Sequence, residues 1–541
     1  MKKKKLKIKK AVFLIIPLLI IYYLTSIQFV NVIYFYNSSK SFMKYLIYTG
    51  IILVGLSLVL FTYFGFKNLI KNKIKSYVIY IIFISLFIGG QIFVSHNLNR
   101  ISNSLSKITN SESGYSTSII TLKDSDINSI KDLEEKTIGM INDSNNNEGY
   151  VLPMEIIKQE NLDEENIADY DDFIEMLNDL YNNKIDAMFI SSSYVSMFAT
   201  QEGFENIANE TKEIYKKEKK NIKKVNTSNK TFSEPFTLLI MGVDSDAESL
   251  KKSNSFNGDT LMLITFNPNT MNATILSIPR DTRVPIVCTK YKSKNKINSA
   301  AYYGADCVMD TITSFTGIEI DYWVKVNFQA VISIVDALGG IEVDVPYAFC
   351  ESSANRTFGK DTVYVEKGLQ ILDGKKALAF ARNRHTWPQY CGKKYSKYNS
   401  NDFIRGQNQQ QLVKATVNKL KEIRSLSQIY DLLDIVGDNI DTNIDKDTMI
   451  TGFDTFKNII FNSKNINSDD FIGTQRLYLS GYDNMINGIY YFEYYKQSLE
   501  DVVEAMEINL EIKEPDMDKD FSFSINNPYE DTQIGKGTYK Y

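Results

Sequence analysis

The first hundred residues are dominated by three long apolar runs. They extend over about 11–36, 42–66 and 76–95, and each reaches the ~20 residues that a helix needs to cross ~30 Å of hydrocarbon. The alternative is a cleaved signal peptide followed by two buried helices. The first run is too long for a signal sequence, however, and lacks a small-residue cleavage site. The pattern therefore predicts three transmembrane helices within residues 11–96.

The lysines around these runs predict their orientation. Residues 2–10 contain seven lysines and residues 67–75 contain four, whereas the first loop has only Lys40 and Lys44. Such a bias marks the cytoplasmic side of a membrane. We therefore expect a multi-pass protein of the cell membrane, with a basic tail (residues 1–10) in the cytoplasm and the chain after about residue 96 outside the cell.

The rest of the chain alternates short strands with helices and is divided by polar segments. Residues 97–114 are rich in Ser and Asn, and residues 211–234 are rich first in Lys and Glu and then in Asn, Ser and Thr, so both are predicted linkers. Between them, residues 115–210 predict a small α/β accessory domain with strands at Thr137–Ile141 and Asp186–Ile190. This segment loosely resembles one lobe of an extracellular solute-binding protein; we favour the alternative, a spacer without a ligand of its own.

Residues 235–512 predict a larger α/β domain. Apolar runs predict strands at Phe236–Val243, Thr260–Phe266, Ala273–Ile278, Ile318–Phe328 and Ile341–Val345. Helices are predicted at Gln329–Leu338, from Asp373 to about Arg382, and at Asp402–Arg424. This alternation is typical of a mixed sheet covered by helices. Residues 513–541 contain few aliphatic side chains and predict a disordered tail.

Composition excludes several classes of function. The chain has 541 residues with a net charge of −4, yet its first hundred residues carry 14 Lys or Arg and no acidic residue. A basic, apolar N-terminal segment followed by an acidic remainder of the chain argues against nucleic-acid binding and for membrane anchoring. With only His96 and His385, a histidine-rich metal site is excluded. The sequence also contains no phosphate-binding P-loop, nucleophile elbow or C-x-x-C pair.

Arginine is concentrated in one region. Six of the nine arginines lie between residues 280 and 405: Arg280, Arg283, Arg356, Arg382, Arg384 and Arg405. The planar guanidinium suits bidentate contact with phosphate oxygens. Ordinary salt bridges are the alternative. Arg405 and Gln409 are four residues apart, so they share one face of the predicted helix.

Two carboxylates stand at predicted strand ends. Asp244 follows the first strand and Asp259 precedes the second. If these strands are neighbours, both side chains lie at one edge of the sheet, where α/β proteins bind ligands. One or two carboxylates together with substrate oxygens commonly hold Mg²⁺, and Mn²⁺ is an alternative ion; capping of a turn or helix is the structural alternative. The apolar stretches 331–338 and 377–381 line a lipid groove or belong to the core, and core is the more common outcome.

All four cysteines lie in the predicted outer domain. An even number of cysteines in an oxidising compartment can pair, and four allow three connectivities. We predict Cys288–Cys307 and Cys350–Cys391, each closing a loop near the arginine cluster. Reduced, buried thiols are the alternative.

The order of motifs resembles a known family. The motifs are Met241–Ser245, Gly258–Thr260, Leu276–Thr282, Lys296–Ala300, Val335–Val345, Leu372–Gly374, Ala377–Arg384 and Asp402–Gln410. They resemble the LytR-CpsA-Psr (LCP) family of membrane-anchored glycopolymer transferases of Gram-positive bacteria, from about residue 236 to 424. Three spans and an accessory domain ahead of the catalytic domain are most similar to its capsule-type members.

The resemblance implies an activity and a set of site residues. The activity is Mg²⁺-dependent transfer of a glycan phosphate, for a capsule or teichoic-acid-like polymer, from a polyprenyl-pyrophosphate carrier to peptidoglycan. The implied metal ligands are Asp244 and Asp259. The implied pyrophosphate ligands are Arg280, Arg382, Arg384, Arg405 and Gln409. Either Asp281 or the substrate itself accepts the proton of the acceptor hydroxyl. The insertion 385–401 is not a family motif, and its aromatic side chains either contact sugar or form a surface loop.

Two other functions are compatible with the same sequence. One is a sensor, in which the accessory lobe binds an extracellular ligand, although a cytoplasmic part of ten residues and one short loop argues against signalling. The other is a hydrolase that only removes the pyrophosphate.

Overall fold

The computed structural model describes eight segments of the chain, together with single residues outside them. These segments are 114–198, 203–220, 230–243, 254–397, 401–423, 426–437, 439–445 and 472–514. The three predicted spans lie almost wholly outside the described residues, as do Asp244 and the predicted tail beyond residue 514. Within the part that is described, no helix is both long and apolar enough to cross a membrane.

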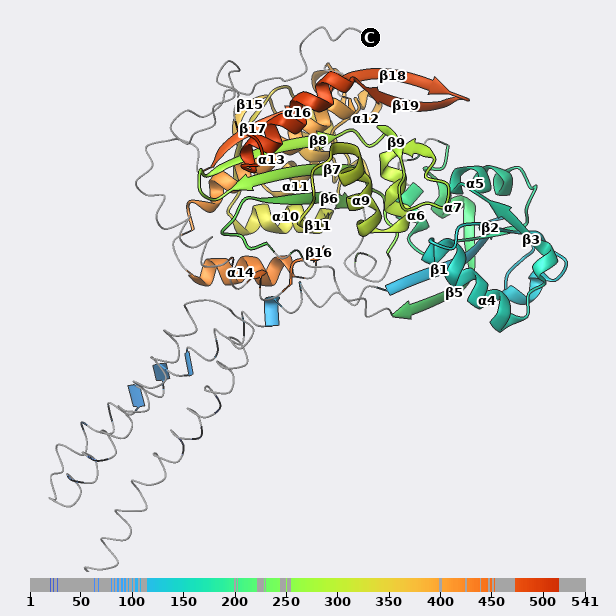
Figure 1. Cartoon of the computed structure of the whole chain (residues 1–541), viewed down its shortest axis with the longest axis horizontal. Helices are drawn as coiled ribbons and strands as arrows, with labels where there is room; N and C mark the ends of the chain where they lie inside the picture. Colours follow the sequence, from blue (N-terminus) through green and yellow to red (C-terminus); the bar gives the residue numbers. More distant parts are fainter. Residues whose placement is uncertain are drawn as a thin grey trace, which may run out of the picture. The chain divides into compact units, whose positions relative to one another are not determined.

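The chain divides into two compact units. One comprises Met1–Ser106 with Lys446–Phe453, and the other comprises Lys107–Asp445 with Asp454–Tyr541. The second unit contains both large sheets, which are the five-stranded sheet of the accessory domain and a six-stranded sheet (Figure 1). The site described below lies in this second unit.

The accessory sheet has five strands in the order β3-β2-β4-β1-β5. The strands are β1 (Gly114–Leu122), β2 (Ile138–Ile141), β3 (Ile167–Tyr170), β4 (Ala187–Ser191) and β5 (Thr211–Lys220). The helices are α4 (Leu152–Glu160), α5 (Phe173–Tyr181), α6 (Tyr194–Phe198) and α7 (Ile207–Glu210). The predicted strands at Thr137–Ile141 and Asp186–Ile190 are confirmed as β2 and β4.

The predicted linker 211–234 is wrong in its first ten residues. Thr211–Lys220 forms β5, which pairs antiparallel with β1 along the whole length of both strands. Because β5 is an edge strand, its Lys and Glu side chains remain largely in water while its backbone completes the sheet. A charged composition therefore concealed a strand, and the accessory sheet extends ten residues further than the sequence suggested.

The second sheet is mixed and has six strands in the order β16-β11-β6-β7-β8-β17. They are β6 (Phe236–Val243), β7 (Thr260–Asn267), β8 (Asn272–Ile278), β11 (Tyr322–Asn327), β16 (Ile440–Thr442) and β17 (Gly473–Tyr478). Shorter strands are β9 (Arg283–Pro285), β10 (Lys294–Lys296), β12 (Ile341–Val345), β13 (Phe349–Glu351), β14 (Val363–Val365), β15 (Gly368–Leu372), β18 (Gly481–Ile486) and β19 (Ile489–Tyr494). The expected mixed α/β sheet is thus confirmed.

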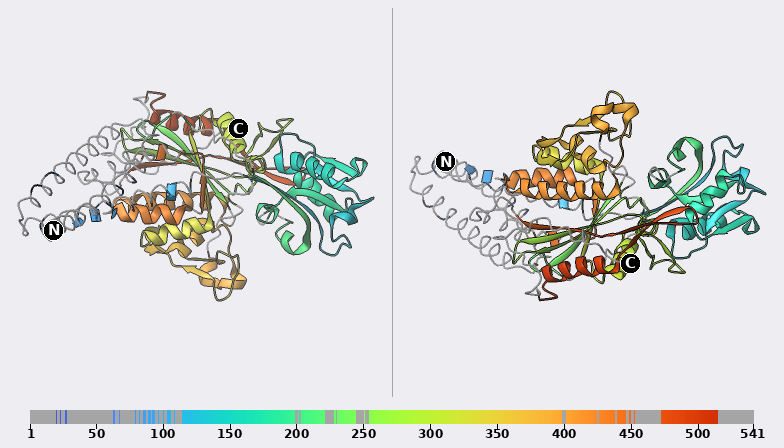
Figure 2. Two further views of the ribbon diagram at one scale, coloured as in Figure 1. Left: turned by 90° about the horizontal axis from the view of Figure 1, so that it is seen from below. Right: turned by 90° about the horizontal axis from the view of Figure 1, so that it is seen from above.

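Helices cover both faces of this sheet. They are α9 (Ala305–Thr316), α10 (Phe328–Ala337), α11 (Gly374–Arg382), α12 (Pro388–Cys391), α13 (Asp402–Leu420), α14 (Leu426–Val436) and α16 (Lys496–Asn509). In Figure 2, α16 (red) lies on one side of the sheet, and α10, α11 and α13 (yellow to orange) lie on the other.

Alternation along the central strands separates a closed face from an open one. On β6, Leu239 and Met241 are fully buried in the core beneath α9 and α16. The residues between and after them, Ile240 and Gly242, point to the opposite face. That second face, under α10, α11 and α13, encloses a cavity instead of a filled core.

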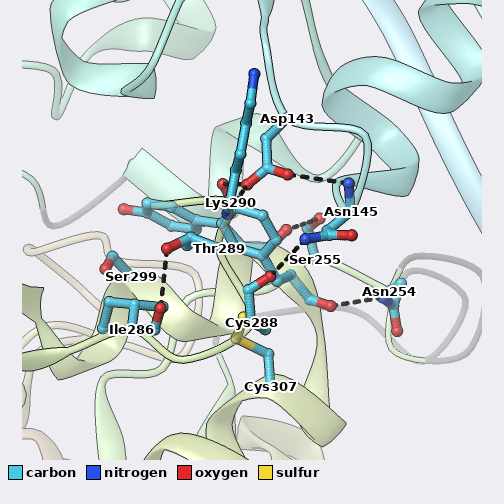
Figure 3. The surroundings of a disulfide bond; sticks show 12 residues. Asp143, Asn145, Asn254, Ser255, Ile286, Cys288, Thr289, Lys290, Ser299 and Cys307 are labelled. Carbon is cyan, nitrogen blue, oxygen red and sulfur yellow. Dashed lines mark hydrogen bonds between the residues drawn. A yellow bond between two sulfur atoms is a disulfide. The ribbon is translucent and has the colours of Figure 1, made fainter. Parts of the chain in front are cut away.

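Polar contacts join the accessory domain to the larger domain. The buried carboxylate of Glu148 accepts hydrogen bonds from the backbone N–H groups of Asn254 and Ser255, at 3.1 and 3.2 Å. The Asp143 carboxylate accepts from the backbone N–H of Lys290 at 2.9 Å (Figure 3). It also accepts from the Tyr303 hydroxyl at 3.3 Å. Acids of the accessory domain therefore satisfy hydrogen-bond donors of the larger domain, including two in the segment that leads to the start of β7.

Candidate active site

A cavity of about 610 Å³ lies between the second face of the large sheet and three helices. Its apolar wall includes Ile240, Met262 and Val326 from the sheet and Ile334, Leu378 and Val413 from α10, α11 and α13. The volume falls in the range of small-molecule sites. The stretches 331–338 and 377–381 were expected to belong to the core more often than to line a groove, and they do both. Val335 is buried in a core cluster and also lines the cavity, and Val331 and Ile334 line the cavity as well.

The cavity has a charged end and an apolar end. Arg405, Gln409, Val413 and Val417 line it from successive turns of α13. Twelve residues of helix span ~18 Å, so the lining changes from cationic to aliphatic over roughly that length. The charged end coincides with the start of α13, where the Asn401 side chain caps the helix.

A cluster of five charged side chains lies at the charged end, and three of them, Asp259, Arg384 and Arg405, line the cavity. Arg280 follows β8, and its Nη1 lies 2.6 Å from Oδ1 of Asp259 at the start of β7. Asp402, in the first turn of α13, lies 3.4 Å from Arg280 Nε, 3.5 Å from Arg405 Nη2 and 3.9 Å from Arg384 Nη1. Among these five side chains, three guanidinium groups face two carboxylates. Arg280 Nε also lies 3.5 Å from Asp281, which pairs with Lys296 at 2.7 Å, so the wider group holds four cations and three carboxylates. The excess of one positive charge suits an anion.

The electrostatics of the cluster agree with that count. Burial alone favours the neutral form of Asp259, but the charges of Arg280, Arg405 and Arg384 outweigh burial and hold the pKa of this carboxyl well below its usual range. Burial, together with the like charges of Arg280 and Arg405, lowers the pKa of Arg384. The charge on Arg384 is therefore disfavoured in the absence of a further anion.

Arg382 reaches the cavity from the end of α11. The helix begins at the predicted Asp373, whose side chain accepts a hydrogen bond from the backbone N–H of Lys376. The Arg382 guanidinium donates to the Ser353 carbonyl at 2.9 Å and stacks 4.7 Å over the ring of Phe328. Part of its donor fork is thus used to fix its position at the cavity wall.

Gln409 and Asp281 have protein partners. Both amide hydrogens of Gln409 are used, because Nε2 donates to Thr260 Oγ1 at 2.9 Å and to the Ala381 carbonyl at 3.0 Å. Gln409 therefore ties α13 to β7 and α11, and its direct phosphate contact stays a prediction. Asp281 lies 2.7 Å from Lys296 Nζ and is not among the residues that line the cavity. Its role as the base also stays a prediction.

Of the two predicted metal ligands, the structure describes Asp259 at the cavity. β6 and β7 are antiparallel neighbours with Gly242 opposite Thr260, so the edge predicted to bring Asp244 and Asp259 together exists. Asp244 itself lies outside the described residues. Within the described part of the chain, no group of three or more His, Cys, Asp or Glu side chains is arranged to hold a metal ion. Asp259 fits a site completed by substrate oxygens.

Asp402 is a site residue that sequence reasoning missed. Its contact with three arginines follows from the packing of α13 against the loop after β8. The available signal was its spacing: an acid in the first turn of a helix, three residues before Arg405, faces that arginine.

Both predicted disulfides are present. Cys288–Cys307 has a Cα–Cα distance of 5.6 Å, and Cys350–Cys391 has one of 6.1 Å. The first disulfide belongs to the larger domain and lies next to the accessory domain, whose Asn145 side-chain amide donates to the Cys288 carbonyl (Figure 3). The second ties α12, in the insertion after Arg384, to β13.

Comparison with known proteins identifies two family matches along the chain. The LytR_cpsA_psr family matches residues 197–508. A second family, described as an ABC transporter phosphonate, periplasmic substrate-binding protein, matches residues 86–239. The second match agrees with the loose resemblance of the accessory segment to a solute-binding lobe.

Relatives cover the larger domain. The chain is 32% identical over 296 residues to the polyisoprenyl-teichoic acid–peptidoglycan teichoic acid transferase TagU of Bacillus subtilis, covering 54% of this chain and 83% of that protein. It is also 32% identical to the corresponding transferase TagV of the same organism, over 51% of this chain and 65% of that protein. The crystal structure of B. subtilis TagV aligns with 52% of this chain and 99% of its own, at 29% identity and a TM-score of 0.42. The family match covers more than half of the chain, and the protein belongs to the LytR-CpsA-Psr family.

Proposed function

We propose that this protein transfers a glycopolymer, as its phosphate, from a polyprenyl-pyrophosphate carrier to peptidoglycan. The observation that carries the proposal is the cavity, which is aliphatic at one end and bears an excess of arginine charge at the other. This shape and charge match a lipid joined to a pyrophosphate. Relatives at 32% identity are named as transferases of teichoic acid from a polyisoprenyl carrier to peptidoglycan.

The described residues suit phosphoryl transfer. A hydroxyl of peptidoglycan attacks the phosphorus that bears the glycan, the bridging P–O bond breaks, and polyprenyl phosphate leaves with the bonding electrons. The hydroxyl proton passes to a carboxylate such as Asp281 or to a substrate oxygen. Negative charge grows on the leaving phosphate, and Arg384 and Arg405 at the charged end neutralise it. Gln409 ties α13, which carries Arg405, to α11, which ends two residues before Arg384.

Transfer, hydrolysis and mere binding are separated by one assay. The full chain in detergent is given a labelled polyprenyl-pyrophosphate-linked glycan, with and without peptidoglycan. Transfer moves the label into peptidoglycan and releases polyprenyl phosphate only when the acceptor is present. Release without the acceptor supports a pyrophosphate hydrolase, and binding without turnover supports a sensor; either result overturns the proposal.

Mg²⁺, with Mn²⁺ as an alternative, is part of the proposal. Asp259, with Asp244, would hold the ion against the donor's phosphate oxygens, and the ion would supply further neutralisation of charge. Replacing Asp259 with Asn should raise the Mg²⁺ concentration needed for half-maximal transfer. The same substitution should weaken Mn²⁺ binding measured by paramagnetic relaxation in the presence of the donor. If both quantities match those of the wild type, Asp259 serves only as the counter-ion of Arg280.

Anchoring and topology also belong to the proposal. We place three spans within residues 11–96, a cytoplasmic tail 1–10, an accessory domain from residue 115 and a catalytic domain at 235–512, both outside the cell. This arrangement suits a lipid-linked donor, because the cavity must meet a carrier that resides in the membrane. Single cysteines introduced at Lys40 and Lys71 into a cysteine-free variant test it. A membrane-impermeant thiol reagent should label the first in intact cells but not the second.

A further inference from the structure

The insertion between Arg384 and α13 carries a compact cluster of aromatic rings. Phe358 and Tyr390 are stacked, with ring centroids 4.2 Å apart and an angle of 9° between the planes. Trp387 packs against both rings, at 5.1 Å from Phe358 and 6.3 Å from Tyr390. Phe358 and Trp387 line the cavity, and Tyr390 is 54% exposed. We call Phe358, Trp387 and Tyr390 the aromatic platform.

The platform is held rigidly. The disulfide Cys350–Cys391 fixes the residue that follows Tyr390 to β13. Further along the insertion, the Tyr395 hydroxyl donates to Glu366 at 2.7 Å, and Lys394 pairs with the same carboxylate at 2.6 Å. A surface loop without a function needs no such bracing. Rigid aromatic side chains bind ligands at a low cost in conformational entropy.

The position of the platform in the chain indicates which part of the donor it can contact. The insertion begins after Arg384, which lines the charged end of the cavity, and ends at Asp402, which lies 3.9 Å from Arg384. Trp387 is three residues from Arg384, so their backbones are at most ~11 Å apart. Val417, at the aliphatic end, lies ~18 Å from Arg405 along α13. The platform therefore adjoins the pyrophosphate position and not the lipid end.

We propose that the aromatic platform binds the first pyranose ring of the donor, the sugar bonded directly to the pyrophosphate. This inference rests on the proposed function. An aromatic ring presents a large apolar surface with a negative face, which attracts the C–H groups on one side of a sugar ring. The exposed Tyr390 ring, which stacks on Phe358, offers such a face, and Phe358 and Trp387 line the same cavity as the arginines. The platform then selects donors by their first sugar, while the arginines bind the phosphates common to all donors.

The test compares two lipids on the full-length protein in detergent. One is a polyprenyl pyrophosphate, and the other is the same lipid carrying a single N-acetylglucosamine. Tyr390→Ala should weaken binding of the sugar-bearing lipid about three- to tenfold, the scale of one aromatic contact, and leave binding of the sugar-free lipid unchanged. Tyr390→Phe keeps the ring and should bind both lipids as the wild type does.

A matched control is Tyr364→Ala. Tyr364 is also an exposed tyrosine, 44% accessible, but it packs against Tyr395, which lies outside the platform. It should bind both lipids normally. Phe358→Ala is a second variant in case Tyr390→Ala perturbs folding, which thiol titration of the Cys350–Cys391 bridge would reveal.

Three results would overturn the inference. An equal loss for both lipids means that the insertion merely supports the arginines. No loss for either lipid means that the platform does not touch the donor. A normal donor affinity with a raised KM for peptidoglycan means that the platform binds an acceptor sugar. Failure of the proposed function itself looks different, because the wild-type protein would then either bind neither lipid or bind them without moving the label into peptidoglycan.

Discussion

Arg384→Met separates two roles that an arginine in this cluster can have, binding an anion and stabilising the fold. Arg384 lies 3.9 Å from Asp402, whereas Arg280 makes a 2.6 Å ion pair with Asp259. Burial and the positive charges of its neighbours lower the pKa of Arg384, which means that the unliganded fold disfavours its charge. Removing that charge should leave the free energy of unfolding unchanged or increase it by up to ~1 kcal/mol.

Arg280→Met is the matched comparison. It leaves the carboxylate of Asp259, whose side chain is 15% exposed, without its closest partner, and breaking a buried ion pair typically costs ~3–5 kcal/mol. Arg405 and Arg384 still attract Asp259, so we expect a loss at the lower end of that range, about 3 kcal/mol. Two arginines in one cluster should thus differ in their effect on stability, because one is paired at short range and the other is not.

Although the loss of Arg384 should have little effect on stability, it should strongly weaken binding of the donor. If Arg384 is poised for an anion, its loss removes a charge-assisted hydrogen bond worth ~1.5–3 kcal/mol, or about ten- to a hundredfold in affinity for a polyprenyl pyrophosphate. Arg384→Lys should lose nearly as much, because it keeps the charge but not the planar fork. A salt-bridge role would instead tolerate lysine.

Urea denaturation of the full chain, followed by tryptophan fluorescence, measures the stability. The only two tryptophans, Trp323 and Trp387, both lie in the catalytic domain, so the signal reports on the domain that contains the cluster. The reasoning is refuted if Arg384→Met lowers the free energy of unfolding as much as Arg280→Met does. It is also refuted if Arg384→Met and Arg384→Lys bind the lipid pyrophosphate with wild-type affinity.

Other expectations concern the fold around the site. Gly374→Ala should lower the free energy of unfolding by about 1–3 kcal/mol, because a Cβ there would lie 2.3 Å from the Ile332 carbonyl oxygen; an unchanged urea midpoint would contradict the tight packing of α10 on α11. Glu148→Gln should increase amide exchange at 254–259, because the carboxylate that accepts from two backbone N–H groups there is weakened. Thiol titration of the unfolded, unreduced chain should find no free cysteine. Burial and Arg384 lower the pKa of His385, so folding favours its neutral form; stability should fall as pH drops below ~6.5 towards the folded pKa, and His385→Gln should remove that part of the decline.

Much of the fold follows from local patterns in the sequence. The strand Phe236–Val243 was predicted with the bounds that the structure shows, because a short, continuous apolar run between polar residues is typical of a buried strand. The start of α11 at Asp373 followed from its capping chemistry. The edge strand β5 was missed for the opposite reason. Its side chains are charged, and it is a strand only because β1 offers a backbone partner.

Some features of the site also follow from the sequence, whereas others depend on how the elements pack. Residue types and short spacings along the chain were enough to reveal the family motifs, the concentration of arginine between residues 280 and 405, and a cysteine pairing that the structure confirms. The resemblance to the family also implied that Gln409 binds phosphate. Its two hydrogen bonds to Thr260 and Ala381, which depend on how three elements pack, reveal that its donors are already used.

Which charges meet is determined by tertiary packing. Asp259, Arg280, Arg384, Asp402 and Arg405 come from four separate segments, and their balance of three cations to two anions appears only when β7, β8, α11 and α13 pack together. The same packing decides that an apolar helix face borders a cavity and not a filled core. Periodicity marks which side of a helix avoids water, but the volume left between that side and the sheet depends on every side chain that packs around it.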